Sequence, residues 1–282
     1  LGLTIDAIQT ELIEKLLIYD NGNEFKNNVI NSGILQNYSN NTYALYVTGN
    51  LTNNGTIQNN VYNFQVNISG NMTNNGTWTN HTTTLNGNGN QGISMSQPFQ
   101  GSNLVRNAST GRVRATSGLS FIGTDITLNS DTLEFTTGNS ISMNGGSLNS
   151  GVLYKTALPA LQITTSNGTY AYIMTIDAFQ SEFNGDLRIY GNSNVFRKNV
   201  INFGTLQNYQ NNSYFLTVAG NFTNNGTVKN NVYNFTVFVS GNLANNGAWT
   251  NYSTVLNGTA NQGMAMTQPF NGSYFSKTAS AG

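Results

Sequence analysis

The sequence contains a long internal repeat. Residues 3–111 and 174–282 align without a gap at an offset of 171, and about 65 of the 109 aligned positions are identical. Duplication on this scale predicts structural units that stack on one another, so we expect a longer parent protein built as an array of such units. The expected divisions are a first unit over 1–111, a connecting β-rich part of the same unit over 112–173, and a second, incomplete unit over 174–282.

A shorter period of about 21 residues lies inside each long repeat. It is marked by Gly33, Gly55 and Gly76, which are spaced by 22 and 21 residues. Short pieces rich in Val, Ile, Tyr and Phe separate these Gly/Asn turns, a pattern typical of solenoids in which each coil stacks on its neighbour. The sequence therefore predicts an all-β fold, a parallel β-helix (β-solenoid) with coils of about 21 residues.

Two columns of side chains follow the corner glycines and have different predicted roles. We expect the apolar column in the core. We expect the asparagine column at the corners, where the amides of successive coils could bond as a ladder, and where Asn and Gly tolerate left-handed backbone. The core column consists of Leu35, Ile57, Trp78, Leu206, Val228 and Trp249, and the ladder column of Asn37, Asn59, Asn80, Asn208, Asn230 and Asn251.

Residues 5–20 leave a helix open as an alternative, because their apolar spacing suits an amphipathic helix. The equivalent residues 176–191 contain Asn184-Gly185 in their middle, a turn signal that a helix interior resists. Since the two copies should share a fold, we predict strand–turn–strand for both.

The chain is polar but carries little charge. Charged residues make up 8% and the net charge is zero, so the sequence offers no electrostatic attraction for nucleic acid. Aromatic residues make up 11% and there are only 3 Pro, which argues against disorder. The absence of cysteine excludes disulfides and thiolate metal sites, and no apolar run is long enough to predict a membrane span.

Few residues suit catalysis, and we expect neither an enzyme nor a cofactor. The single histidine, His81, is replaced by Tyr252 in the second copy, which favours an exposed turn residue over a base or ligand. Asp6 and Glu11 form the best acidic pair, but five positions along a strand direct them to opposite faces. The other candidates are a Ca²⁺-binding turn at Asp125, Asn129 and Asp131, a basic cluster of Arg106, Arg112 and Arg114, and sugar stacking on Trp78 and Trp249. Solvated turns, a solvated face and core packing are the preferred interpretations of these three.

Several segments resemble the Asn/Gly/Thr-rich parallel β-helix repeats of large secreted bacterial surface adhesins, haemagglutinin-like and of the Bacteroidetes type. They are LNGNGNQGISM (85–95), LNGTANQGMAM (256–266) and TGRVRATSGLSFIGTDITLNSDTLEF (110–135). The resemblance implies a right-handed β-helix, secretion, and a role in adhesion or surface structure.

We therefore expect a structural or adhesive extracellular segment of a large cell-surface or fibre protein. Its expected partners are surface glycans or other copies of the chain, and neither nucleic acid nor membrane lipid. A glycan-binding module and a β-helix from a phage or virus fibre stay open as alternatives. A polysaccharide lyase is less favoured, because it would need clustered carboxylates in a groove.

Overall fold

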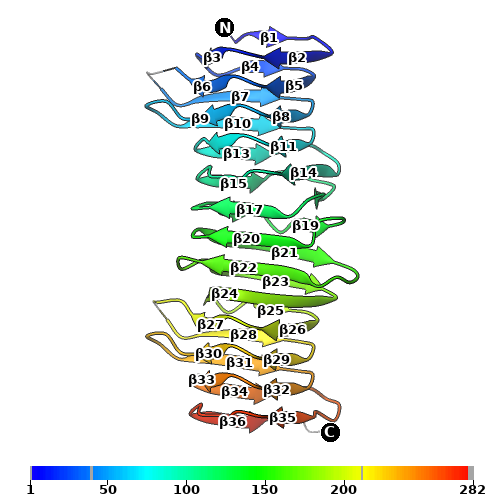
Figure 1. Cartoon of the computed structure of the whole chain (residues 1–282), viewed down its shortest axis with the longest axis vertical. Coiled ribbons are helices and arrows are strands. Elements are labelled where there is room, and N and C mark those ends of the chain that lie inside the picture. The colour runs from blue at the N-terminus through cyan, green and yellow to red at the C-terminus, as the bar shows by residue number, and fades with distance from the viewer. Residues whose placement is uncertain (1, 39–40, 211, 279–282) are drawn as a thin grey trace. The chain divides into compact units, whose positions relative to one another are not determined.

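The computed structural model describes residues 2–38, 41–210 and 212–278. Every regular element in this part of the chain is a β-strand. The chain divides into two compact units, unit 1 (Leu1–Gly138) and unit 2 (Asn139–Gly282). Within each unit the strands stack coil upon coil (Figure 1), and each coil turns through three faces. The predicted all-β parallel solenoid is confirmed.

In unit 1 each face is a ladder of parallel strands from successive coils. The first face contains β1 (Thr4–Ile5), β4 (Asn23–Phe25), β7 (Tyr43–Val47), β10 (Phe64–Ile68), β13 (Thr82–Leu85), β15 (Asn103–Arg106) and β18 (Asp125–Thr127). The second contains β2 (Gln9–Leu12), β5 (Asn28–Asn31), β8 (Leu51–Asn53), β11 (Met72–Asn74), β14 (Gln91–Met95), β16 (Val113–Ala115) and β19 (Thr132–Phe135). The third contains β3 (Lys15–Ile18), β6 (Ile34–Asn37), β9 (Thr56–Gln58), β12 (Thr77–Thr79) and, beyond a bridge at Phe99, β17 (Leu119–Ile122).

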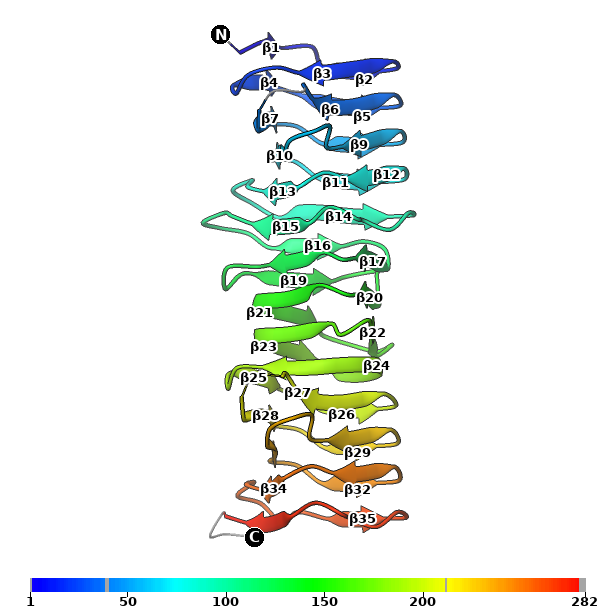
Figure 2. The same ribbon diagram turned by 90° about the vertical axis from the view of Figure 1, so that its left-hand side faces the viewer.

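Unit 2 also has three faces, which we name by the sequence equivalence of its strands with those of unit 1; its first strands are longer and turn a corner without a break. The first face contains the C-terminal parts of β21 (Ser147–Lys155) and β23 (Tyr170–Ala178), then β25 (Asn194–Phe196), β28 (Tyr214–Val218), β31 (Phe235–Val239), β34 (Ser253–Leu256) and β36 (Tyr274–Lys277). The second contains β20 (Ser140–Asn144), β22 (Leu161–Ser166), the N-terminal part of β24 (Gln180–Tyr190), β26 (Asn199–Asn202), β29 (Phe222–Asn224), β32 (Leu243–Asn245) and β35 (Met264–Met266). The third contains the remaining parts of β21, β23 and β24, then β27 (Thr205–Asn208), β30 (Thr227–Lys229) and β33 (Ala248–Thr250). Figure 2 shows the second-face strands β26, β29, β32 and β35 one beneath the other.

The apolar column fills the interior of each unit. Leu35, Ile57 and Trp78 lie opposite one another in successive coils, and all three side chains are fully buried. The indole N–H of Trp78 donates to Asn80 Oδ1 and Thr83 Oγ1, both at 3.0 Å, so this buried donor is satisfied. The equivalent side chains of unit 2 are buried in the same way: Leu206, Val228 and Trp249.

The doubtful segment at residues 5–20 consists of strands and turns. Its main elements are β2 and β3, both paired in parallel with the next coil, so the strand–turn–strand prediction is confirmed and the helix alternative is wrong. In the second copy the turn is part of one continuous strand, β24, which changes face at Gly185 with φ of 93°.

The corner glycines are required for close approach of the backbone, and not for left-handed φ. A Cβ on Gly55 would lie 2.2 Å from the carbonyl oxygen of Gly33, which accepts the N–H of Thr56 at 2.8 Å. A Cβ on Gly76 would lie 2.1 Å from the oxygen of Gly55. None of these corner glycines is among the residues with positive φ, so the expected reason for their presence is wrong.

The amide ladder lies in a different column from the expected one. Asn31 Nδ2 donates to Asn53 Oδ1 at 2.8 Å, and Asn53 Nδ2 donates to Asn74 Oδ1 at 3.0 Å, all inside the unit. Unit 2 repeats this chain through Asn202, Asn224 and Asn245. These residues precede the corner glycines by two positions, and the tight corner superposes them from coil to coil.

We expect Gly55→Ala to lower the free energy of unfolding by more than 2 kcal/mol, about the cost of overpacking a well-packed site. The added methyl would displace the backbone of the preceding coil at Gly33. Gly263→Ala is the matched control, because its Cβ would meet no atom closer than 3.4 Å. Urea unfolding followed by circular dichroism compares the two, and equal midpoints would contradict the close-approach argument.

We expect Asn53→Asp to destabilise the protein by several kcal/mol at neutral pH. The carboxylate would lose the donor that now serves Asn74 Oδ1 and the Thr77 carbonyl, and would be buried among acceptors. Because this burial raises the carboxyl pKa, stability should recover as pH falls towards 4. Exposed Asn54, whose Oδ1 only accepts from Asn75, provides the control variant Asn54→Asp. Melting temperatures that respond equally to pH in both variants would exclude a buried ladder.

Candidate functional site

The acidic residues are placed singly along the stack and are paired with different neighbours. Asp6 accepts from Lys26 at 3.5 Å and from Asn27 at 3.1 Å, whereas Glu11 accepts from Ser32 at 3.3 Å. In the second copy Asp177 pairs with Arg197 and Glu182 accepts from Gln162 and Gln180. Within the described ranges, no group of three or more Asp, Glu, His or Cys side chains could hold a metal ion. Asp6 and Glu11 thus accept from different side chains, as do Asp177 and Glu182.

The basic cluster expected from the sequence is not formed. Arg106 is 1% exposed, and its guanidinium bonds Asp131 at 2.6 Å, Gln91, and backbone carbonyls including that of Thr110 at 2.9 Å. Arg112 and Arg114 lie outside and both pair with Glu134. Arg106 therefore ties neighbouring turns together, and the expectation of three arginines on one solvated face is wrong for it.

The turn at Asp131 and the single histidine have local structural partners. Asp131 is held by Arg106 and by the N–H of Thr132, while Asn129 Nδ2 donates to the Arg106 carbonyl at 2.7 Å. Asp125 lies on β18, the strand that precedes this turn. His81 is half-buried in its turn, and its Nδ1 is 2.9 Å from Thr82 Oγ1. A cation bound by Asp131 would have to displace the Arg106 guanidinium.

The asparagines expected to form the ladder instead hold the corner where the third face returns to the first. Asn37 Nδ2 donates to the carbonyls of Asn41 and Tyr62, and Asn59 Oδ1 accepts the N–H groups of Phe64 and His81. Asn80 bonds the carbonyls of Phe64 and Thr82. In unit 2, Asn208, Asn230 and Asn251 make the equivalent bonds to backbone. These amides position the residues that follow them, and several of those residues are tyrosines.

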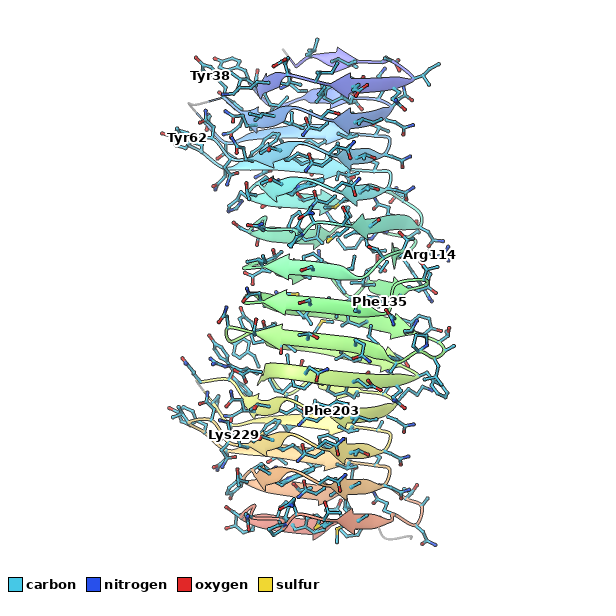
Figure 3. All side chains as sticks on the ribbon, in the orientation of Figure 1. Tyr38, Tyr62, Arg114, Phe135, Phe203 and Lys229 are labelled. Carbon is cyan, nitrogen blue, oxygen red and sulfur yellow. The ribbon has the colours of Figure 1, made fainter. Side chains whose placement is uncertain are left out.

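Tyrosines gather at this corner in unit 1. Tyr19 and Tyr38 directly follow β3 and β6, and Tyr43 begins β7; we call these three rings the unit 1 cluster. The Tyr19 ring centroid is 5.6 Å from that of Tyr38 and 5.5 Å from that of Tyr43. Tyr19 is 63% and Tyr38 40% exposed, whereas Tyr43 is buried. Figure 3 shows Tyr38 and Tyr62 along one edge of the unit, away from Arg114.

A larger cluster lies at the equivalent corner of unit 2. It consists of Tyr170, Tyr172, Tyr190, Tyr209 and Tyr214, all half-buried, which we call the unit 2 cluster. Tyr190 is central, with its ring centroid 4.9–5.9 Å from four of the other rings. Offset or edge-to-face contacts of this kind add about 0.5–1.5 kcal/mol per pair. The rings therefore hold one another in place while part of each stays in contact with water.

Polar side chains adjoin the unit 2 cluster on the third face. Tyr170 lies opposite Arg188, whose Nε is 3.3 Å from Asp186 Oδ2. Gln207 Nε2 donates to Asp186 Oδ1 at 2.6 Å. In unit 1 the positions of Asp186 and Arg188 are occupied by Lys15 and Leu17. The combination of aromatic faces with fixed hydrogen-bonding groups can bind a polar ligand that also has apolar faces.

An exposed Val-Tyr pair lies beside each cluster. Val61 is 71% and Tyr62 48% exposed, and the second copy repeats this at Val232 (71%) and Tyr233 (46%). The Asn37–Tyr62 bond joins the connection that carries this pair to the corner of the unit 1 cluster. We therefore treat the two tyrosine clusters and their Val-Tyr pairs as the candidate functional site.

Sequence reasoning did not single out these tyrosines. The signal was present, because four of them recur at the 171-residue offset, as Tyr19 and Tyr190, Tyr38 and Tyr209, Tyr43 and Tyr214, and Tyr62 and Tyr233. Trp78 and Trp249 are fully buried, so the preferred interpretation of core packing is confirmed and the sugar-stacking alternative is wrong.

No protein-family model, curated protein or solved structure matches the chain. In the described residues no helix has the length and apolar character needed to cross a membrane.

The tyrosine clusters predict a late phase in alkaline titration. Burial raises the pKa of Tyr43, and Tyr19 and Asp20 raise it further. Burial likewise raises the pKa of Tyr214, with smaller effects of Tyr190 and Tyr172. Ultraviolet titration should therefore show these two phenols ionising after the exposed ones, and Tyr43→Phe should remove part of the late phase.

The raised pKa values of Tyr43 and Tyr214 also predict how the stability of the protein depends on pH. Both phenols are neutral in folded and unfolded chains below pH about 10, so their contribution is fully present there. It is lost as pH rises above that value and through the raised folded-state pKa. Tyr43→Phe should lose less stability than the parent over this range, and an unchanged alkaline profile would exclude the role of Tyr43.

Proposed function

We propose that the chain is a structural and adhesive segment of an extracellular surface or fibre protein, in which a solenoid presents tyrosine-rich corners. The observation that carries this proposal is the recurrence, at a 171-residue offset, of both the internal bonding and the outward tyrosines. A scaffold of this kind lengthens by duplication, because each coil is stabilised by its nearest neighbours.

The distribution of polar groups supports a scaffold more than a catalyst. Several surface acids are paired with polar or basic side chains of the neighbouring coil, as in Asp6–Lys26 and Arg114–Glu134. Such pairs join neighbouring coils, and a carboxylate engaged in this way is poorly suited to acid–base chemistry on sugars. Extracellular or cell-surface location is part of the proposal and rests on the resemblance to secreted adhesin repeats.

A glycan-binding module is the second candidate, and the unit 2 cluster favours it. Aromatic side chains beside fixed polar groups are the features expected of a site for sugars. A β-helix from a phage or virus fibre would share the same scaffold, and only the parent gene distinguishes it from a cell-surface protein.

The proposal is tested with beads coated with the full chain and washed under shear over surfaces bearing polysaccharides, collagen or cultured cells. We expect retention on at least one surface, compared with beads coated with serum albumin. The same polysaccharides incubated with soluble protein should release no reducing ends. Beads that are never retained would contradict adhesion, and rapid release of oligosaccharides would contradict a non-catalytic role.

A further inference from the structure

We propose that the unit 2 cluster, together with Arg188 and Asp186, is a binding site for a neutral polysaccharide built from pyranose rings. The inference rests on the proposed adhesive function and names the ligand class of one of its surfaces.

The rings of the unit 2 cluster contact one another and form one surface, and are not isolated exposed side chains. Tyr190 of β24 contacts the four other members of the cluster, which come from β23, β28 and the end of β27. Gly191 lies close enough to Tyr172 that a Cβ there would be 3.2 Å from its ring. Tyrosine rings present apolar faces for the C–H groups of a sugar at low cost in side-chain entropy.

The polar groups beside the rings are also held in place. Asp186 receives both the Arg188 guanidinium and the Gln207 amide, and Gly168 lies against Arg188, where a Cβ would be 3.2 Å from its NH1 nitrogen. Donors and acceptors fixed in this way suit the hydroxyl groups of a sugar, because they lose little freedom on binding.

The charge of the site favours a neutral ligand. Arg188 and Asp186 cancel each other, and Gln207 adds none. Lys229 lies opposite Gln207 in the next coil, and unit 1 carries Gln58 at that position. Arg188 and Asp186 are partly exposed, so a neutral chain can use the rings and this ion pair, while the buried Gln207 holds Asp186 in place.

The two copies supply a comparison within one molecule. The outward residues that adjoin the rings are Asp186 and Arg188 in unit 2, but Lys15 and Leu17 in unit 1. Equivalent coils therefore fold with either pair of residues at these positions. Substitutions that convert the unit 2 residues into those of unit 1 should change binding without changing the fold.

The test is affinity electrophoresis of the full chain in native gels containing hydroxyethylcellulose, glucomannan or polygalacturonate, followed by calorimetry with the best polymer. We expect retardation in a neutral polymer. Tyr190→Ala should weaken binding about tenfold, the effect of losing roughly one stacking interaction, and Arg188→Leu should also weaken it. Tyr252→His, which restores the residue of the first copy and lies outside both clusters, is the control expected to bind as the parent does.

Several outcomes would overturn the assignment. They are no retardation in either neutral polymer, retardation that survives both Tyr190→Ala and Tyr209→Ala in folded protein, and stronger retardation in polygalacturonate that Lys229→Gln abolishes. Self-association that Tyr190→Ala abolishes would assign the surface to a second copy of the chain instead. Bead retention on collagen or cells without polysaccharide binding would reject this site while leaving the adhesive function standing.

Discussion

Parallel hydrogen bonding between successive coils is the constraint on which the rest of the structure depends. Each strand pairs with its counterpart one coil later, so a residue type that suits one coil meets its own kind in the next. Leu35 packs under Ile57, Asn31 bonds Asn53, and the Gly33 carbonyl meets Gly55. An apolar column, an amide ladder and a close backbone approach are therefore three results of a single register.

This register explains how successive coils are held together although only 8% of the residues are charged. Ion pairs such as Arg197–Asp177 and Arg114–Glu134 join neighbouring coils, but exposed pairs of this kind contribute only about 0–1 kcal/mol each. Buried amides link successive coils in the interior, because each can both donate and accept without a net charge. Asn53 does both, giving to Asn74 and receiving from Asn31.

The coil length, the strand assignment and the buried apolar column could be predicted from the sequence because they depend on periodicity alone. The position of the amide ladder could not, because the columns of Asn53 and Asn59 have the same period. They differ in the corner that each one adjoins. Asn53 precedes a tight glycine corner that superposes successive coils, whereas Asn59 faces a longer connection whose backbone takes up its hydrogen bonds. The tyrosine clusters combine residues from several strand ends, and only coordinates bring those together.

The corner that returns from the third face to the first is also the place where coil length varies. Five residues join β9 to β10, but only two join β12 to β13, and the strand register adjusts so that Gln65 lies opposite Thr82. The opposite corner keeps its spacing, with Asn53 opposite Asn74. Insertions and deletions at the variable corner thus leave the interior bonding undisturbed. Natural variation, or a peptide grafted in the laboratory, could alter what the molecule displays there without altering how it folds.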